Sequence, residues 1–163
     1  MDPLLGYPPF SSTGEVFRPA TWVADGILRD LAYPRTYGVQ QLGVEAGLPT
    51  SGAFHMSGGK TTIDEMIATT TRGILVTRFS DVGVVDYVSF MESGYTRDGL
   101  WLIENGAISK AIKNFRFTES PLFALNQIEQ IGTSVRVFHP RTPIAAPALK
   151  VRDFSFTSLA DAV

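Results

Sequence analysis

The sequence predicts an α+β fold, with a mainly antiparallel β-sheet and two or three short helices packed on it. Segments of β-forming residues recur along the chain, two pairs of them are joined by hairpin turn signals, and only three segments begin like helices. Hydrophobic residues make up 44% and charged residues 18% of the 163 residues, which is too apolar for a disordered chain. A chain of 17.8 kDa buries about two-thirds of its surface on folding. We therefore expect one core and a single domain over residues 1–163.

The first 60 residues are predicted to contain a hairpin, a short helix and a long loop. β-forming residues on both sides of the turn signal Asp25-Gly26 predict a β-hairpin over residues 15–32. A short helix is expected over residues 34–42, ending at Gly43. Residues 43–59 contain five glycines and a proline, and so predict a long loop.

A capping box predicts a helix that begins after Thr62. The Thr62 hydroxyl can accept a hydrogen bond from the backbone N–H three residues on, and the Glu65 side chain can bind back to the backbone of Thr62. The following apolar residues form one stripe that we expect to be buried. They are Ile63, Met66 and Ile67.

The second half of the chain is predicted to be mostly β-structure. The expected strands, in chain order, are residues 73–79, 84–92, 100–103 and 107–112. The last two flank Glu104-Asn105-Gly106, a second hairpin signal. In the next strand, alternation places Phe115 and Phe117 on one face, with Asn114 and Arg116 on the other.

A third helix is predicted to begin at Ser120, an N-cap residue followed by Pro121 at the first helical position. Gly132 is expected to end this helix in a left-handed cap. Its buried stripe consists of Leu122, Leu125, Ile128 and Ile131. Two more strands are expected over residues 134–138 and 148–154. In the second, Lys150 and Arg152 alternate with Leu149 and Val151, so one face meets solvent or a partner.

Charge and scarce residue types exclude several functions. Fourteen Lys+Arg against sixteen Asp+Glu give a net charge of -2, without the basic excess that nucleic-acid binding requires. The sequence has no cysteine, which excludes disulfides, thiolate zinc ligands and a cysteine nucleophile within the chain. No signal peptide or membrane-spanning segment is evident. We therefore expect a soluble, intracellular protein that binds neither nucleic acid nor membrane.

Few side chains are candidates for chemistry. His55 and His139 are the two histidines, and neither has an acidic or histidine neighbour at ligand spacing, whereas a metal site needs three or four converging ligands. Arg78, Arg97 and Arg116 are candidates for carboxylate recognition. The alternative is that each arginine is a solvated or salt-bridged residue on an outward strand face.

Two further patterns have simple structural explanations. Ser57-Gly-Gly-Lys-Thr-Thr62 imitates the end of a phosphate-binding loop, but Phe54 occupies the position of the required first glycine. Asp81 and Asp86 flank Gly83 and could form a carboxylate pair, although turn chemistry explains them more simply.

Four longer segments form an ordered pattern over most of the chain. They are Thr71-Arg-Gly-Ile-Leu-Val-Thr-Arg-Phe79, Gly94-Tyr-Thr-Arg-Asp-Gly-Leu-Trp-Leu-Ile-Glu-Asn-Gly106, Lys113-Asn-Phe-Arg-Phe-Thr-Glu-Ser120 and Pro147-Ala-Leu-Lys-Val-Arg-Asp-Phe154. Together with the Ile27-Leu28 hairpin and the Glu65-Met-Ile67 helix upstream, they resemble the C-terminal domain of the TldD/PmbA proteins. The resemblance extends from near Asp2 to near Phe154.

This resemblance implies a family of cytoplasmic, metallopeptidase-related proteins, historically described as modulators of DNA gyrase and linked to peptide maturation and antitoxin degradation. Full-length members have an N-terminal portion that we expect to be absent here. In the active subfamily that portion supplies a zinc-binding helix with two histidines and a glutamate, and a cysteine late in the C-terminal domain completes the site. This chain has neither the helix motif nor a cysteine. The resemblance is therefore closer to the PmbA-type subunit, which lacks the zinc site, and it implies no zinc or other cofactor in this chain.

Two functional hypotheses from different classes follow. In the first, the chain is a non-catalytic domain that forms a peptide-holding assembly with a TldD-type subunit or as a homo-oligomer, and so contributes to proteolysis or peptide maturation. Its ligand is a peptide or unfolded polypeptide, and its candidate contacts are Arg78, Asn114 and Arg116, because an open sheet edge can pair with an extended peptide and arginine binds carboxylates. In the second, the chain is a stand-alone metal-dependent peptidase that uses His55 or His139 with nearby carboxylates.

Overall fold

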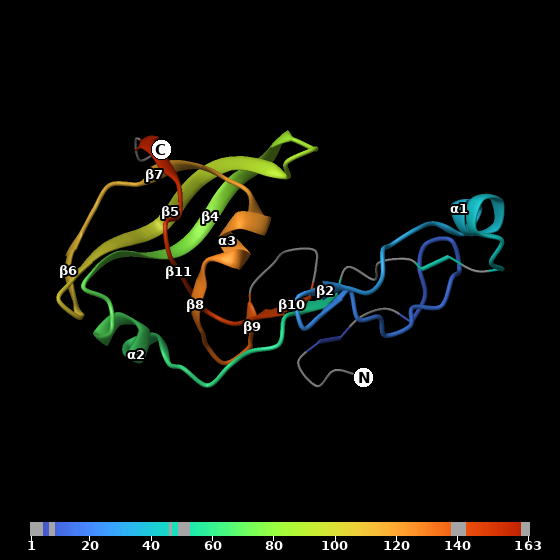
Figure 1. Cartoon of the computed structure of the whole chain (residues 1–163), viewed down its shortest axis with the longest axis horizontal. Coiled ribbons are helices and arrows are strands. Elements are labelled where there is room, and N and C mark those ends of the chain that lie inside the picture. Colours follow the sequence, from blue (N-terminus) through green and yellow to red (C-terminus); the bar gives the residue numbers. More distant parts are fainter. Residues whose placement is uncertain (1–4, 7–8, 46, 49–52, 138–142, 161–163) are drawn as a thin grey trace. The chain divides into compact units, whose positions relative to one another are not determined.

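The structure, a computed structural model, describes residues 5–6, 9–45, 47–48, 53–137 and 143–160. The chain forms two compact units, each built from two segments. The first unit consists of Met1–Ser57 and Ser134–Ala146, and the second of Gly58–Thr133 and Pro147–Val163. Short helices and mostly antiparallel strands confirm the predicted α+β class (Figure 1). A single domain over the whole chain stays a prediction.

The hairpin predicted in the first unit forms at its turn but has very short strands. β1 (Val23–Ala24) pairs with β2 (Ile27–Leu28) in antiparallel orientation. The turn residues Asp25 and Gly26 have φ angles of 53° and 74°, as the type I′ hairpin turn requires. Pairing extends over only two residues of each strand, although the sequence predicted a hairpin over residues 15–32. The side chains of Val23, Ile27 and Leu28 remain more than half exposed, so burial adds little to support longer strands.

The remaining elements of the first unit are a helix and a small three-stranded sheet. The predicted helix forms as α1 (Arg35–Tyr37), which continues into the π-helix η1 (Gly38–Leu42) and ends at Gly43 with a φ of 66°. In the sheet, β10 (Ile144–Ala146) lies between β3 (Phe54–His55) and β9 (Val135–Val137).

The loop predicted over residues 43–59 is therefore wrong at β3. Two backbone hydrogen bonds hold this strand beside β10: the Phe54 N–H donates to the Pro143 carbonyl at 3.1 Å, and the Met56 N–H to the Ala145 carbonyl at 2.9 Å. Both acceptors come from much later in the chain, so local turn signals could not reveal the pairing. β10 itself was not predicted.

The second unit is built on a five-stranded antiparallel sheet. Along the sheet the order is β12 (Phe156–Leu159), β7 (Phe115–Glu119), β5 (Met91–Glu104) and β4 (Arg72–Asp86), and β6 (Ala107–Ala111) pairs with β5. Figure 1 shows β4 and β5 as a long pair of ribbons that ends in a hairpin turn. The predicted hairpin between β5 and β6 is confirmed, since Asn105 and Gly106 have φ angles of 52° and 80°.

The strand predicted over residues 84–92 is interrupted by the turn between β4 and β5. Residues 87–90 form this turn. The Asp86 carboxylate accepts hydrogen bonds from the Ser89 hydroxyl at 2.6 Å and from the N–H groups of Val88 and Ser89 at 3.0 and 3.3 Å. These bonds, the Ser89 hydroxyl first among them, lower the pKa of Asp86. An aspartate that binds the backbone just ahead of it competes with strand formation, and here it outweighs the β propensity of the segment.

Helix α3 (Pro121–Asn126) is shorter than predicted. It begins where the sequence placed it, but the Ser120 hydroxyl does not cap it and instead donates to the Ser89 carbonyl at 2.9 Å. The residues expected in its second half form β8 (Ile128–Ile131), which pairs with β11 (Leu149–Val151).

Other expectations for this helix are also corrected. Leu122 and Leu125 are 52% and 48% exposed, so they form no buried stripe. Gly132 does not end a helix. It forms an isolated parallel β-bridge with Thr61, and its N–H donates to the Ala148 carbonyl. The strand predicted over residues 148–154 is shorter, because pairing with β8 ends at Val151. The later strand β12 was not predicted.

Helix α2 (Ile63–Ala68) begins with the predicted capping box. The Glu65 N–H donates to the Thr62 hydroxyl at 3.2 Å, and the Thr62 N–H donates to the Glu65 carboxylate at 2.7 Å. Met66 is 7% exposed and joins the core, whereas Ile63 is 51% exposed. The predicted apolar stripe is therefore only partly buried.

The capping box makes stability depend on pH. Hydrogen bonds from the Thr62 backbone and hydroxyl lower the pKa of Glu65 below its ordinary value of 4.5. Because the folded-state pKa is the lower one, this contribution is present above pH 4.5 and is lost as the pH falls through the folded-state pKa. We expect Glu65→Gln to flatten the pH dependence of the unfolding free energy in this range, and Thr62→Ala to lower that free energy by about 1 kcal/mol at pH 7. Urea titrations between pH 3 and 7 measure both effects, and an unchanged pH profile in Glu65→Gln would contradict the first.

Candidate functional site

The second unit contains a wide groove. Its volume is about 1090 Å³. One wall is formed by α2 and the first residues of β4, and another by α3, β8 and β11. The floor belongs to the five-stranded sheet. The groove thus lies on one face of this sheet, and its lining comes from segments spread over the whole unit.

Four phenylalanines form an aromatic cluster at the groove. Phe79 and Phe117 contact each other edge to face, with ring centroids 4.8 Å apart. Phe154 stacks on Phe79 at 5.5 Å, and lies 5.6 Å from Phe117 and 5.1 Å from Phe156. Offset and edge-to-face pairs of this kind stabilise beyond the area they bury. Phe117 is only 5% exposed, so the cluster is also part of the core.

Gly94 explains why Phe117 can lie flat across the sheet. The two residues are directly opposite each other in β5 and β7. A Cβ atom on Gly94 would lie 2.9 Å from the Phe117 ring and 2.9 Å from the Ser80 carbonyl oxygen. The absence of a side chain on β5 therefore leaves the space that the Phe117 ring fills.

Polar bonds hold the walls of the groove in place. The Glu119 carboxylate accepts from the Ser120 N–H at 2.9 Å and from the Ser155 N–H at 3.1 Å. The Lys150 ammonium donates to the Thr69 carbonyl at 3.1 Å, and this bond ties β11 to the end of α2. Since these groups are already engaged, the walls are pre-formed without a ligand.

One carboxylate at the groove remains without such a partner. Glu92 lies directly opposite Glu119 across β5 and β7. Within the described residues, no donor lies within hydrogen-bonding distance of the Glu92 side chain, whereas both oxygens of Glu119 are occupied. Two glutamates in direct opposition give this end of the groove a negative charge. The arrangement suits an apolar ligand that offers N–H groups or a positive charge at one end.

The arginines predicted as contacts lie on the other face of the sheet. Arg78 is paired with Arg97, and Arg116 with Tyr95. Residues 95 and 97 point to the same side of β5, so Arg78 and Arg116 share a face. Their neighbours Phe79 and Phe117 point into the groove, which places the arginines on the opposite side.

Two residues that were predicted to contact a peptide, Arg78 and Asn114, instead bind other side chains of the same unit. Arg78 forms an ion pair with Asp98 in which both side chains are more than half exposed, a type of pair that adds little stability. The Asn114 side chain accepts a hydrogen bond from the Thr96 hydroxyl at 3.2 Å, and Thr96 is fully buried. Asn114 thus helps to hold β5 beside β7. The groove was not predicted from the sequence, although the phenylalanines that recur at residues 115–117 and 154–156 were a signal for it.

The histidines are placed only in part. His55 lies in β3 opposite Ala145, and His139 is outside the described residues. Over the described ranges, no three His, Cys, Asp or Glu side chains gather as a metal site would require. No helix in the same ranges is long and apolar enough to cross a membrane.

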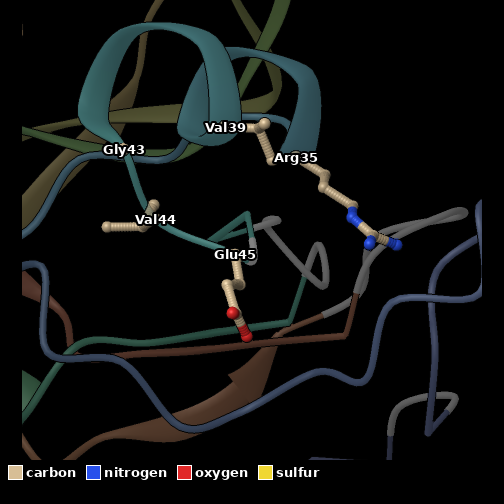
Figure 2. A pocket seen from close by; sticks show the side chains of 5 residues that line it. All are labelled: Arg35, Val39, Gly43, Val44 and Glu45. Carbon is tan, nitrogen blue, oxygen red and sulfur yellow. The ribbon is translucent and has the colours of Figure 1, made fainter.

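The first unit contains a smaller hollow of about 460 Å³ at the end of η1. Its lining residues are Arg35, Val39, Gly43, Val44 and Glu45. Figure 2 shows the Arg35 and Glu45 side chains extending in different directions, so their charges do not converge on one point. The hollow therefore lacks the convergent polar groups of a typical ligand site.

Comparison with known proteins gives a consistent result. The model of the PmbA/TldA metallopeptidase C-terminal domain matches residues 1–158. A search of curated proteins found no match. Among solved structures, TldE from Thermococcus kodakarensis superposes with a TM-score of 0.71 at 13% identity, covering 94% of this chain and 36% of that one.

Two proposed modulators of DNA gyrase have a similar fold. The protein from Thermotoga maritima gives a TM-score of 0.70 at 20% identity, covering 88% of this chain and 34% of its own. The protein from Bacteroides thetaiotaomicron gives 0.67 at 22% identity, covering 93% and 33%. This chain therefore spans about a third of the length of each of these structures.

Proposed function

Because the chain belongs to the PmbA/TldD family as a metallopeptidase C-terminal domain, we propose that it is a non-catalytic domain that holds a peptide or unfolded polypeptide for proteolysis. The proposed place of action is the cytoplasm, in an assembly with a TldD-type subunit or with further copies of this chain. The observation that supports this proposal best is the pre-formed groove with its aromatic cluster.

The groove has the chemical character that an extended peptide requires. Its floor offers aromatic and aliphatic surface for apolar side chains, and its lining also includes charged and hydroxyl side chains. Among the described strands β4 pairs only with β5, and its residues 72–76 line the groove. The free backbone groups of an edge strand can pair with an extended chain, which would add main-chain hydrogen bonds to the apolar contacts.

The residue inventory supports a role without a metal of its own. The sequence has no cysteine and two histidines, so a zinc ion held by this chain alone would depend on His55, His139 and carboxylates. In the proposed assembly, this domain supplies the surface that holds the peptide. The partner subunit supplies the zinc and the hydrolytic groups.

A pair of variants on α3 tests the groove. Leu125 lines it and is 48% exposed, whereas Leu122 on the same helix is 52% exposed and is not among the lining residues. We expect Leu125→Glu to weaken the binding of a fluorescein-labelled, apolar 12-residue peptide about tenfold, because one buried leucine contact is lost. Leu122→Glu is expected to bind as the wild type does. Fluorescence anisotropy measures both dissociation constants, and equal effects of the two variants would contradict binding in the groove.

The same peptide tests the absence of catalysis. After incubation with the isolated chain the peptide is expected to remain intact by mass spectrometry, and elemental analysis is expected to find zinc far below one equivalent. Cleavage with one equivalent of bound zinc, abolished by His55→Ala or His139→Ala, would instead support the stand-alone peptidase.

A further inference from the structure

The face of the sheet opposite the groove has three arginines on three adjacent strands. We call this surface the arginine face and define it as Arg78, Tyr95, Arg97 and Arg116. Arg78 and Arg97 are directly opposite each other on β4 and β5, and Tyr95 is opposite Arg116 on β7. Like charges directly opposite each other destabilise a sheet. The sheet therefore keeps Arg78 and Arg97 opposite each other despite their repulsion, although the chain as a whole carries a net negative charge.

The charges on this face are only partly compensated. Arg78 pairs with Asp98, and the guanidinium of Arg97 lies 3.8 Å from the carboxylate of Asp81. Arg116 is exposed, and within the described part of the chain its side chain donates only to the Ser93 hydroxyl, at 3.2 Å. Among the described residues no carboxylate lies within ion-pair distance of Arg116.

Arg97 is held in a fixed position at the centre of the face. Its guanidinium lies 5.7 Å from the centroid of the Tyr95 ring, and its side chain is 20% exposed. Packing against an aromatic ring reduces the entropy that the side chain would lose on binding a ligand. Arg78 and Arg116 flank this centre with exposed side chains.

The spacing of these groups matches an extended acidic chain. Arg97 and Arg116 occupy diagonal positions on adjacent strands, which are about 7–8 Å apart. Side chains at alternate positions of an extended chain point the same way and are about 6.5–7 Å apart. Two carboxylates at alternate positions can therefore reach both guanidiniums, and arginine binds carboxylates through paired, charge-assisted hydrogen bonds.

We propose that the arginine face docks an acidic polypeptide segment in extended form, with carboxylates at alternate positions bound by Arg116 and by the Arg78–Arg97 pair. A partner protein presents this segment. A polypeptide fits better than a nucleic acid because Asp98 and Asp81 already pair with Arg78 and Arg97, which leaves too little uncompensated positive charge for a continuous row of phosphates. The inference does not require the groove to bind peptide.

A peptide pair and three variants of the intact chain test this proposal. The probe is a fluorescein-labelled Gly-Glu-Ser-Glu-Ser-Glu-Gly peptide, and the control peptide has glutamine in place of each glutamate. We expect Arg116→Gln to weaken binding of the acidic probe at least about fivefold, and Arg78→Gln with Arg116→Gln to abolish it. Arg136→Gln, an exposed arginine on β9 in the other unit, is expected to leave binding unchanged. All three variants are first compared with the wild type by circular dichroism and thermal unfolding.

The salt dependence and the control ligands show whether the arginine face binds the acidic peptide. Weaker binding at 300 mM than at 50 mM salt is expected, because screening grows with ionic strength. Equal binding of the glutamine peptide, unchanged binding by the double variant, or no binding of the acidic probe would overturn the proposal. Tighter binding of a thymidine oligonucleotide than of the acidic probe would do the same. Leu125→Glu is expected to leave acidic-peptide binding unchanged, so failure here is distinguishable from failure of the groove.

Discussion

Replacement of Phe117 by alanine is expected to lower the free energy of unfolding by about 3–5 kcal/mol. The Phe117 side chain is 5% exposed and contacts the rings of both Phe79 and Phe154. Its removal leaves a cavity between the sheet and the segment after β11. Gly94, directly opposite, has no side chain that could fill it. The expected result is a large loss of stability, measured by urea unfolding with circular dichroism.

A second phenylalanine serves as the matched control for this prediction. Phe123 lies on α3 and is 61% exposed. Because most of its surface is already in water, Phe123→Ala is expected to change stability far less than Phe117→Ala. If the two variants lost similar stability, the aromatic cluster could not be the core of the second unit.

Replacement of Gly106 by alanine is expected to destabilise the second unit by about 3 kcal/mol, because two costs add at this position. Gly106 has a φ of 80°, a conformation that costs an L-residue about 1–2 kcal/mol. A Cβ atom there would also lie 2.7 Å from the carbonyl oxygen of Ala68, at the end of α2, and such overpacking costs about 1–3 kcal/mol.

Two other glycines separate these costs. Gly26 has a φ of 74°, but a Cβ atom added there would meet no other atom within 4 Å, and Gly83 has neither the positive φ nor a close neighbour. We expect Gly26→Ala to show only the conformational cost and Gly83→Ala to be nearly neutral. Amide hydrogen exchange around each site measures the local loss. If Gly106→Ala loses no more stability than Gly26→Ala, the β5–β6 turn does not lie as close to α2 as the structure shows.

Much of the local structure could be predicted from short-range signals. The capping box at Thr62, the turn at Asn105-Gly106 and the end of α1–η1 at Gly43 all form as expected. In each case the interaction joins groups at most a few residues apart. The order of the strand-like and helix-like segments along the chain also predicted the α+β class and the family, and both are confirmed.

The expectations that were wrong concern segments whose partners are far away in the sequence. Ile128–Ile131 has the spacing of a helix, yet it pairs with Leu149–Val151 as β8. Phe54–His55 lies in a glycine-rich segment, yet it pairs with β10. Backbone hydrogen bonds to a strand that arrives later outweigh the local preference at both places, because every buried backbone group must find a partner.

The two candidate binding surfaces likewise combine features that are local in the sequence with features that depend on long-range pairing. The alternation of Phe115, Arg116 and Phe117 determines from the sequence alone that aromatic and basic side chains leave opposite faces of one strand. Only the register of β4, β5 and β7 decides that Phe79 joins Phe117 on one face, where Phe154 stacks on it, and that Arg78 and Arg97 join Arg116 on the other. Which side chains share a face within a strand can be read from the sequence, since alternation is a local property of the backbone. Which strands lie side by side depends on long-range pairing, so the positions of the groove and of the arginine face become known only from the folded chain.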